Sequence, residues 1–348
     1  MKHKAHAWIA LRALKLIEDS NRAPKLSELL FFYLPDVWEG TWLPDTIIGN
    51  FRPDHIFKMD SDARFLGDPI TDPRMLVSRS ELDRRLTGRR LCLEWVRDSD
   101  VFRQPYRSHP EPGIGGRLPN RVLALGHNLS DMLRLSDFPL WFYARNKRPR
   151  GFRPPGSRGD VDLAAVKLEK LSPSPNFSAR QIAMTFFILS HYVADAHMPL
   201  HCDLRDFKQR DLGLRVSKRV HERLEQYWED KLPSDEELDA LEHATLNEVV
   251  TNLPAGSLLR RLNRDGNFAL STRLTKIKGD EWKEIVNICR VSYAVSREWI
   301  PDNAQRLDDI VGAHSQAVLD DVSTRIFHDA VESVARIWLT VWDRFVGE

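Results

Sequence analysis

Apolar side chains recur along most of this chain at the spacing of an amphipathic α-helix. The first such segment, residues 7–17, places five of them on one broad face: Trp8, Ile9, Leu11, Leu14 and Leu16. The same pattern returns at residues 80–96, 120–135, 179–196, 215–232, 282–300 and 327–346. Runs that alternate with period two are scarce, and only residues 46–51 are a plausible short strand. The sequence therefore predicts an all-α fold, a bundle of many helices.

Length and charge narrow the class of protein. At 348 residues the chain is long enough for one large domain or two ordinary ones, and no internal repeat divides it, so we expect a single domain over residues 1–348. The 51 Lys and Arg residues balance the 50 Asp and Glu residues, which leaves no global field that would attract nucleic acid or an acidic surface. Three scattered cysteines are too few for a disulfide framework.

The first twenty residues do not form a convincing signal peptide. Arg12 and Lys15 interrupt the apolar stretch, and no small-residue cleavage site follows. No run of uncharged apolar residues is long enough for a transmembrane helix. We therefore expect a soluble protein in the cytoplasm, where cysteines stay reduced.

Residues of about 99–160 form a loop-rich basic insertion. Much of the Pro and Gly of the chain lies here, around a helix predicted at residues 120–135. Within it, residues 141–158 interleave basic side chains with aromatic ones. Such a mixture can stack bases and hold a nucleic-acid backbone, contact an anionic membrane surface peripherally, or remain a solvated loop.

Three histidines and an aspartate stand close together in residues 191–201, HYVADAHMPLH, directly after an uncharged run. His191 and Asp195 are four residues apart and share one face of a helix. Pro199 disfavours helical geometry just before it, so the helix should end there. His201 then comes from the chain leaving the helix and can fold back toward the same point.

A second pair, His221 and Glu225, repeats the four-residue spacing. A histidine with a carboxylate one turn away presents two metal ligands from a rigid element. A core histidine with a capping acid is the alternative for a single pair, and we interpret His127 and Asp131 as ordinary helix surface. For both motifs together we favour a metal site, because burying so much unpaired polarity is otherwise costly.

The spacing H-x3-D-x5-H that starts at His191, followed by H-x3-E at His221, resembles the core of the zinc-dependent phospholipase C family. The flanking Tyr192 and Pro199 also fit that pattern. The single-strand-specific zinc nucleases share the family's fold and use Asp in place of the last Glu. The resemblance covers residues 1 to about 230. It implies an all-α bundle of the phospholipase C type with three zinc ions in a cleft.

The resemblance also implies ligands earlier in the chain. The family draws an Asp and a His from an upstream segment, and Asp45 and His55 are the candidates here. Asp36 and Asp54 are alternatives for the carboxylate, and each of these acids can instead be a turn residue beside proline.

The family further implies a site at the N-terminus. Its N-terminal Trp gives an amine and a carbonyl to one zinc, which a nearby histidine also binds. In this chain the Met1 amine, or His3 in its place, would act together with His6. If His3 and His6 are instead solvated terminal residues, the site is dinuclear, so we expect two to three zinc ions.

The resemblance thus implies three groups of ligands: Asp45, His55, His191 and Asp195; Met1, His6 and a bridging Asp195; and His201, His221 and Glu225. Three zinc ions with three carboxylates leave a net charge of about +3, which suits a phosphodiester and its transition state. Asp45 would also orient or deprotonate the attacking water. The implied activity is zinc-dependent hydrolysis of phosphodiester bonds in a single catalytic domain.

The substrate stays open between phospholipid and single-stranded nucleic acid. Tyr227 and Trp228 resemble the phospholipase branch, whereas residues 197–201, HMPLH, resemble the nuclease branch. We expect Glu222 and Glu229 to be ordinary surface acids, and we predict no protein partner. The alternative from another class is a helical binding protein that keeps zinc for structure without catalysis.

Overall fold

The computed structural model describes residues 1–46, 52–58, 117–136, 177–206, 216–233 and 280–346, with short stretches between 250 and 277. Over these residues the chain forms helices and no β-strand, which confirms the all-α prediction. The helix expected at residues 80–96 lies outside the described residues. So do residues 47–51 of the expected strand and all of the basic insertion except residues 117–136.

Helices are present at each of the other segments where the apolar pattern predicts one. They are α1 (His3–Ser20), α6 (Leu118–Arg134), α9 (Ala179–Ala196), α11 (Lys218–Asp230), α14 (Glu281–Trp299) and α16 (Gln316–Val346). The last of these begins well before residue 327, because Leu319 and Val322 continue its buried face. The predicted helix ends elsewhere differ by a few residues, as expected for frayed termini.

Shorter helices connect these segments, and the pattern did not predict them. They are α2 (Pro24–Phe32), α3 (Val37–Thr46), α10 (Pro199–Cys202) and α15 (Leu307–His314), with the 3-10 helices η1 (Leu34–Asp36), η2 (Arg52–His55) and η5 (Leu204–Asp206). Each is too short to show a clear helical period, and α3 contains Pro44 in its interior.

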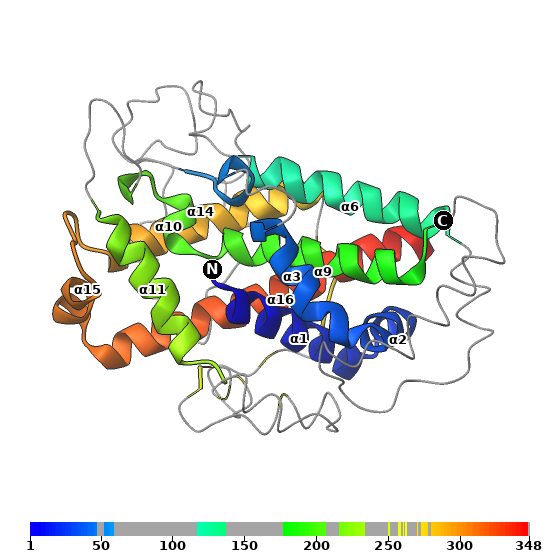
Figure 1. Cartoon of the computed structure of the whole chain (residues 1–348), viewed down its shortest axis with the longest axis horizontal. Helices are drawn as coiled ribbons and strands as arrows, with labels where there is room; N and C mark the ends of the chain where they lie inside the picture. The colour runs from blue at the N-terminus through cyan, green and yellow to red at the C-terminus, as the bar shows by residue number, and fades with distance from the viewer. Residues whose placement is uncertain are drawn as a thin grey trace.

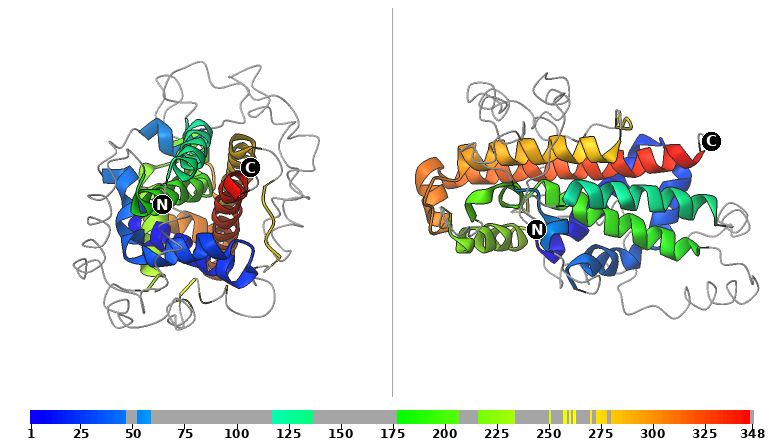
Figure 2. Two further views of the ribbon diagram at one scale, coloured as in Figure 1. Left: turned by 90° about the vertical axis from the view of Figure 1, so that its right-hand side faces the viewer. Right: turned by 90° about the horizontal axis from the view of Figure 1, so that it is seen from above.

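The long helices α6, α9, α14 and α16 run along the length of the molecule (Figures 1 and 2). Helix α9 packs against α1, α3, α6, α14 and α16, so it lies at the centre of the bundle. The Trp338 Nε1 of α16 donates to the Phe186 carbonyl of α9 over 2.9 Å. None of the described helices is both long and apolar enough to span a membrane.

Local chemistry defines both ends of α9. Ser178 accepts from the Gln181 N–H, and the Gln181 side chain accepts from the Ser178 N–H, so a capping box starts the helix. The helix ends at Ala196, and Pro199 then begins the short helix α10. The predicted break before Pro199 is therefore present, and it places His201 on a separate element.

Helix α3 crosses α9 closely at Gly40. A Cβ atom at this position would lie 2.6 Å from the Phe187 Cβ and 2.8 Å from the Met184 Sδ, both on α9. The Phe187 Cβ is attached to the backbone and cannot turn away. The missing side chain therefore sets the spacing between α3, which carries Asp45, and α9, which carries His191 and Asp195.

We predict that Gly40→Ala lowers the free energy of unfolding by about 1–3 kcal/mol, because α3 must move away from α9. Gly312→Ala is the matched control, since a Cβ there meets nothing within 4 Å. That variant should be neutral or more stable by up to about 1 kcal/mol, from helix propensity. Denaturant unfolding measures both, and equal effects would contradict the close approach of the helices.

Candidate metal centre

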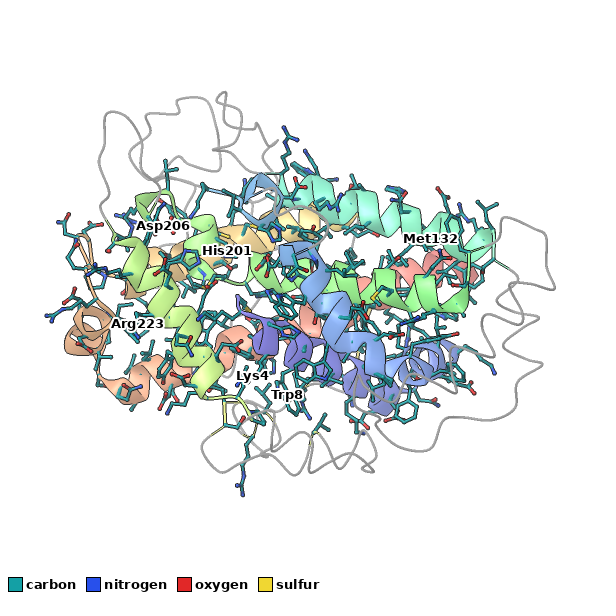
Figure 3. All side chains as sticks on the ribbon, viewed as in Figure 1. Lys4, Trp8, Met132, His201, Asp206 and Arg223 are labelled. Carbon is teal, nitrogen blue, oxygen red and sulfur yellow. The ribbon has the colours of Figure 1, made fainter. Side chains whose placement is uncertain are left out.

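Six separate elements bring the predicted ligands together. The residues come from the start of α1, the end of α3, η2, the end of α9, α10 and α11: Met1, His6, Asp45, His55, His191, Asp195, His201, His221 and Glu225. The N-terminus lies in the middle of the molecule between α11 and α3 (Figure 1). Figure 3 shows His201 beside Asp206, far from Met132 at the opposite end.

The first group consists of Asp45, His55, His191 and Asp195. The Asp195 Oδ2 lies 2.9 Å from the His55 Nδ1 and 3.1 Å from the His191 Nε2. The Asp45 Oδ1 lies 3.7 Å from the His55 Nδ1 and 3.6 Å from the His191 Nε2. Two imidazole nitrogens and two carboxylates thus point at one small volume, as ligands of a single ion would.

The orientation of His191 shows that this volume suits a cation. Its Nδ1 lies 2.8 Å from the Thr41 carbonyl, which can only accept, so Nδ1 carries a proton. In the neutral ring Nε2 then carries a lone pair, which faces Asp195 and Asp45 and lies 3.1 Å from the His55 Nδ1. A lone pair aimed at two carboxylates is unfavourable unless a proton or a metal ion lies between them.

The second group lies at the N-terminus. The Met1 nitrogen is 3.0 Å from the Asp195 Oδ1 and 3.0 Å from the Glu225 Oε1. The His6 Nε2 lies 3.0 Å from the Met1 carbonyl and 3.5 Å from the Asp195 Oδ1. His3 instead stacks on Trp42, so the amine and not His3 lies against these carboxylates.

Charges around the Met1 amine favour a cation at that place. Burial alone would lower the pKa of this amine, but Asp195, Glu225 and Asp45 raise the pKa to about 11. The positive ammonium thus neutralises the buried Asp195 and the partly exposed Glu225 and Asp45. A metal ion can use this nitrogen as a ligand when it displaces the proton.

The third group consists of His201, His221 and Glu225. The Glu225 Oε1 lies 3.3 Å from the His221 Nε2 and 3.7 Å from the His201 Nε2. The His221 Nδ1 lies 2.8 Å from the Asp206 Oδ2. In the neutral ring, with its proton on Nδ1 toward Asp206, His221 again points a lone pair at a carboxylate, as His191 does in the first group.

Asp195 connects all three groups. It is 1% exposed, and its Oδ1 also lies 3.3 Å from the His201 Nδ1. That nitrogen is buried and makes no hydrogen bond of good geometry to any of the described residues. Burial alone would raise the pKa of Asp195, but Met1, His191 and His201 hold it well below its usual range.

The pKa of His221 also indicates that positive charge is favoured in the third group. Burial alone would lower the pKa of this imidazole, but hydrogen bonds to Asp206 and Glu225 raise it. The pKa of His55 is raised in the same way by Asp195 and Asp45 against the effect of burial, whereas burial and the neighbouring His191 lower the pKa of His6. The donor set and its geometry therefore fit metal ions, and these residues form candidate metal-binding groups.

The alternative acids do not belong to these groups. Asp36 forms a bidentate pair with Arg180, at 2.9 and 3.0 Å. Asp54 is absent from the candidate groups of the described residues, where the upstream carboxylate is Asp45. His127 and Asp131 are exposed on α6, as their interpretation as helix surface requires.

A cavity of about 820 Å³ opens onto the ligands. Residues from all three groups line it, together with the partly exposed Trp42 of α3. Asp45 stands at its edge with a third of its side chain exposed. Side chains of all three groups are therefore accessible from this cavity.

Comparisons of the chain with models of protein families, with curated proteins and with solved structures found no match.

Several supporting residues were not apparent from the sequence. Thr41, Lys58 and Asp206 stand at positions without a distinctive pattern. Glu229 was expected to be a surface acid, and this is wrong: it is 7% exposed and accepts from the Ala5 N–H over 2.9 Å. It caps the first turn of α1 from a neighbouring helix, because Lys2 at the N-cap provides no side-chain cap.

We predict that residues added ahead of Met1 lower metal binding by about one divalent ion per chain. An extension turns the amine into an amide, which is a poor ligand, and it must enter a buried volume between Asp195 and Glu225. Mass spectrometry of metal content, before and after proteolytic removal of the extension, measures the effect. Equal metal content in both forms would contradict a ligand role for the amine.

Proposed function

We propose that this protein is a zinc-dependent hydrolase of phosphodiester bonds, belonging with the zinc-dependent phospholipases C and single-strand-specific zinc nucleases. One observation carries the proposal: three ligand groups meet at the buried Asp195 beside an open cavity. The residues that the resemblance implies lie close together, and His6 groups with Asp45 and His191 as well as lying beside Met1 and Asp195. The arrangement also includes the N-terminal amine, which lies between Asp195 and Glu225, and a chance grouping of histidines would not be expected to include it.

Zinc is the metal that this donor set favours. Imidazole nitrogens suit zinc and its neighbours in the first transition series, whereas calcium and magnesium prefer oxygen ligands alone. Catalytic zinc has three protein ligands and one open position. His201, His221 and Glu225 are such a set, and His221 and Glu225 border the cavity.

The residues of the chain have separate roles in this proposal. When bound, zinc ions lower the pKa of a water molecule to about 7 and supply positive charge for a phosphodiester. Asp195 lies between the three groups, and the Thr41 carbonyl accepts from the His191 Nδ1, so the neutral ring presents Nε2 to a metal ion. Asp45 is the catalytic residue, because its partly exposed carboxylate can orient that water or accept its proton.

A helical binding protein with a structural zinc site is the competing function. Structural zinc sites are closed, with four protein ligands and no access for a substrate. The cavity beside these groups therefore favours the hydrolase. Turnover separates the two functions, since only the hydrolase should cleave a phosphodiester.

The two aromatic residues of α11 do not favour the phospholipase branch. Trp228 is buried, donates to the Ser323 Oγ over 3.0 Å and packs edge-on against Phe327. The Tyr227 hydroxyl bonds Asp320. Both side chains attach α11 to α16, so they do not bear on the substrate. A panel of bis-p-nitrophenyl phosphate, single-stranded DNA, RNA and phosphatidylcholine tests both substrate classes.

We predict that the purified protein holds about two to three zinc ions per chain. His191→Ala should lose at least one, because it removes a nitrogen of the first group. His127→Ala, an exposed histidine on α6, is the control and should keep the full content. Elemental analysis measures all three proteins, and less than one tightly bound transition metal in the parent protein would exclude the site.

We also predict that Glu225→Gln lowers turnover of a phosphodiester about 10-fold or more. Loss of a residue that hydrogen-bonds to a metal ligand already costs about 10- to 100-fold, and loss of the ligand itself should cost no less. The amide keeps the size of the side chain and removes its charge. Asp230→Asn, on the exposed face of the same helix, should have little effect. Equal rates in the two variants would show that Glu225 is an ordinary acid.

A further inference from the structure

A buried lysine stands next to the candidate metal centre and contacts none of its ligand side chains. Lys58 follows η2, and its side chain is fully buried. An ammonium has three N–H donors. Those of Lys58 go to the Leu200 carbonyl, to the Asp203 carbonyl over 3.0 Å, and to the Asp206 carboxylate. All three donors are therefore used to hold residues 200–206, the segment that carries His201.

Asp206 extends this contact to a second ligand. One oxygen of its carboxylate pairs with Lys58, and the other lies 2.8 Å from the His221 Nδ1. Asp206 is completely buried, so neither contact is weakened by solvent. A carboxylate oxygen can only accept, so the contact with His221 favours the tautomer of that ring with its proton on Nδ1.

The backbone reinforces the same connection. The Phe57 N–H donates to the His201 carbonyl over 3.0 Å, one residue before Lys58 in the chain. His55 lies two residues further back, on η2. Main-chain and side-chain hydrogen bonds thus join the segment that carries His55 to the segment that carries His201. The contact between Asp206 and His221 joins helix α11 to the same two segments.

We propose that Lys58 and Asp206 form a positioning pair that aligns His55, His201 and His221 for metal binding. This inference rests on the proposed zinc-dependent function and assigns no contact with substrate to either residue. The pair acts through the tautomer and the orientation of the imidazoles, since a ligating histidine is set by the partner of its other nitrogen.

Asp203 offers a matched control from the same segment. Its carboxylate is equally buried and pairs with Arg205 at 2.7 Å and with the Ser296 Oγ at 2.7 Å. These contacts attach the segment to α14 and reach no ligand. Asp203→Asn therefore removes a buried charge, as Asp206→Asn does, without changing the partner of an imidazole.

The test compares zinc affinity in Asp206→Asn and Asp203→Asn by competition with a chromophoric chelator. Asp206→Asn should weaken one of the bound ions about 10- to 100-fold, the effect expected for the partner of a ligating histidine. Asp203→Asn should lower thermal stability with little change in affinity. Lys58→Met should weaken the same ion, and the double variant with Asp206→Asn should be less than additive.

The outcomes separate this inference from the proposed function. Equal zinc affinities for the two aspartate variants would overturn the positioning pair. A parent protein that binds zinc but cleaves none of the phosphodiesters would contradict the proposed hydrolase activity. The zinc affinities of the two aspartate variants would still test whether Lys58 and Asp206 position the histidines. A parent protein without zinc would contradict both.

A measurement on the parent protein remains decisive if Asp206→Asn does not fold. In zinc-loaded protein with ¹⁵N-labelled histidine, the His221 Nδ1 should carry a proton and its Nε2 should show the shift of a metal-bound nitrogen. The reverse assignment, with metal on Nδ1, would overturn the proposal.

Discussion

The contacts of the Asp195 carboxylate determine how the rest of the site is arranged. It stands near the end of the central helix α9, and its oxygens lie within 3.5 Å of the Met1 amine and of imidazoles from α1, η2, α9 and α10. A buried carboxylate without positive partners would be strongly destabilising. The elements that carry these partners must therefore stay packed around α9, and the site and the core of the bundle share one helix.

Two histidines repeat one arrangement in unrelated parts of the chain. His191 is backed by the Thr41 carbonyl and His221 by the Asp206 carboxylate, and in each the other nitrogen faces a carboxylate. In the neutral ring that nitrogen offers a lone pair, and a proton or a metal ion at this position would stabilise its approach to the carboxylate. The three groups therefore share one property, which is that positive charge is favourable between their side chains.

Much of the site can be predicted from the sequence because its two main motifs are local. His191 with Asp195, and His221 with Glu225, share helix faces by their four-residue spacing, and the turn before Pro199 returns His201 to them. The upstream ligands were ambiguous, since Asp36 and Asp45 both lie near a proline. The structure separates them through Arg180, which pairs with Asp36.

The sequence by itself determined the helical class and these two motifs, because periodicity depends on neighbouring residues. Only the tertiary structure decided that the Met1 amine, and not His3, lies against Asp195, that Glu229 caps α1 and that Lys58 pairs with Asp206. These contacts join residues far apart in the chain, and nothing in a local pattern encodes them. They depend on how closely packed helices place a few buried charges, which must find partners once water is excluded.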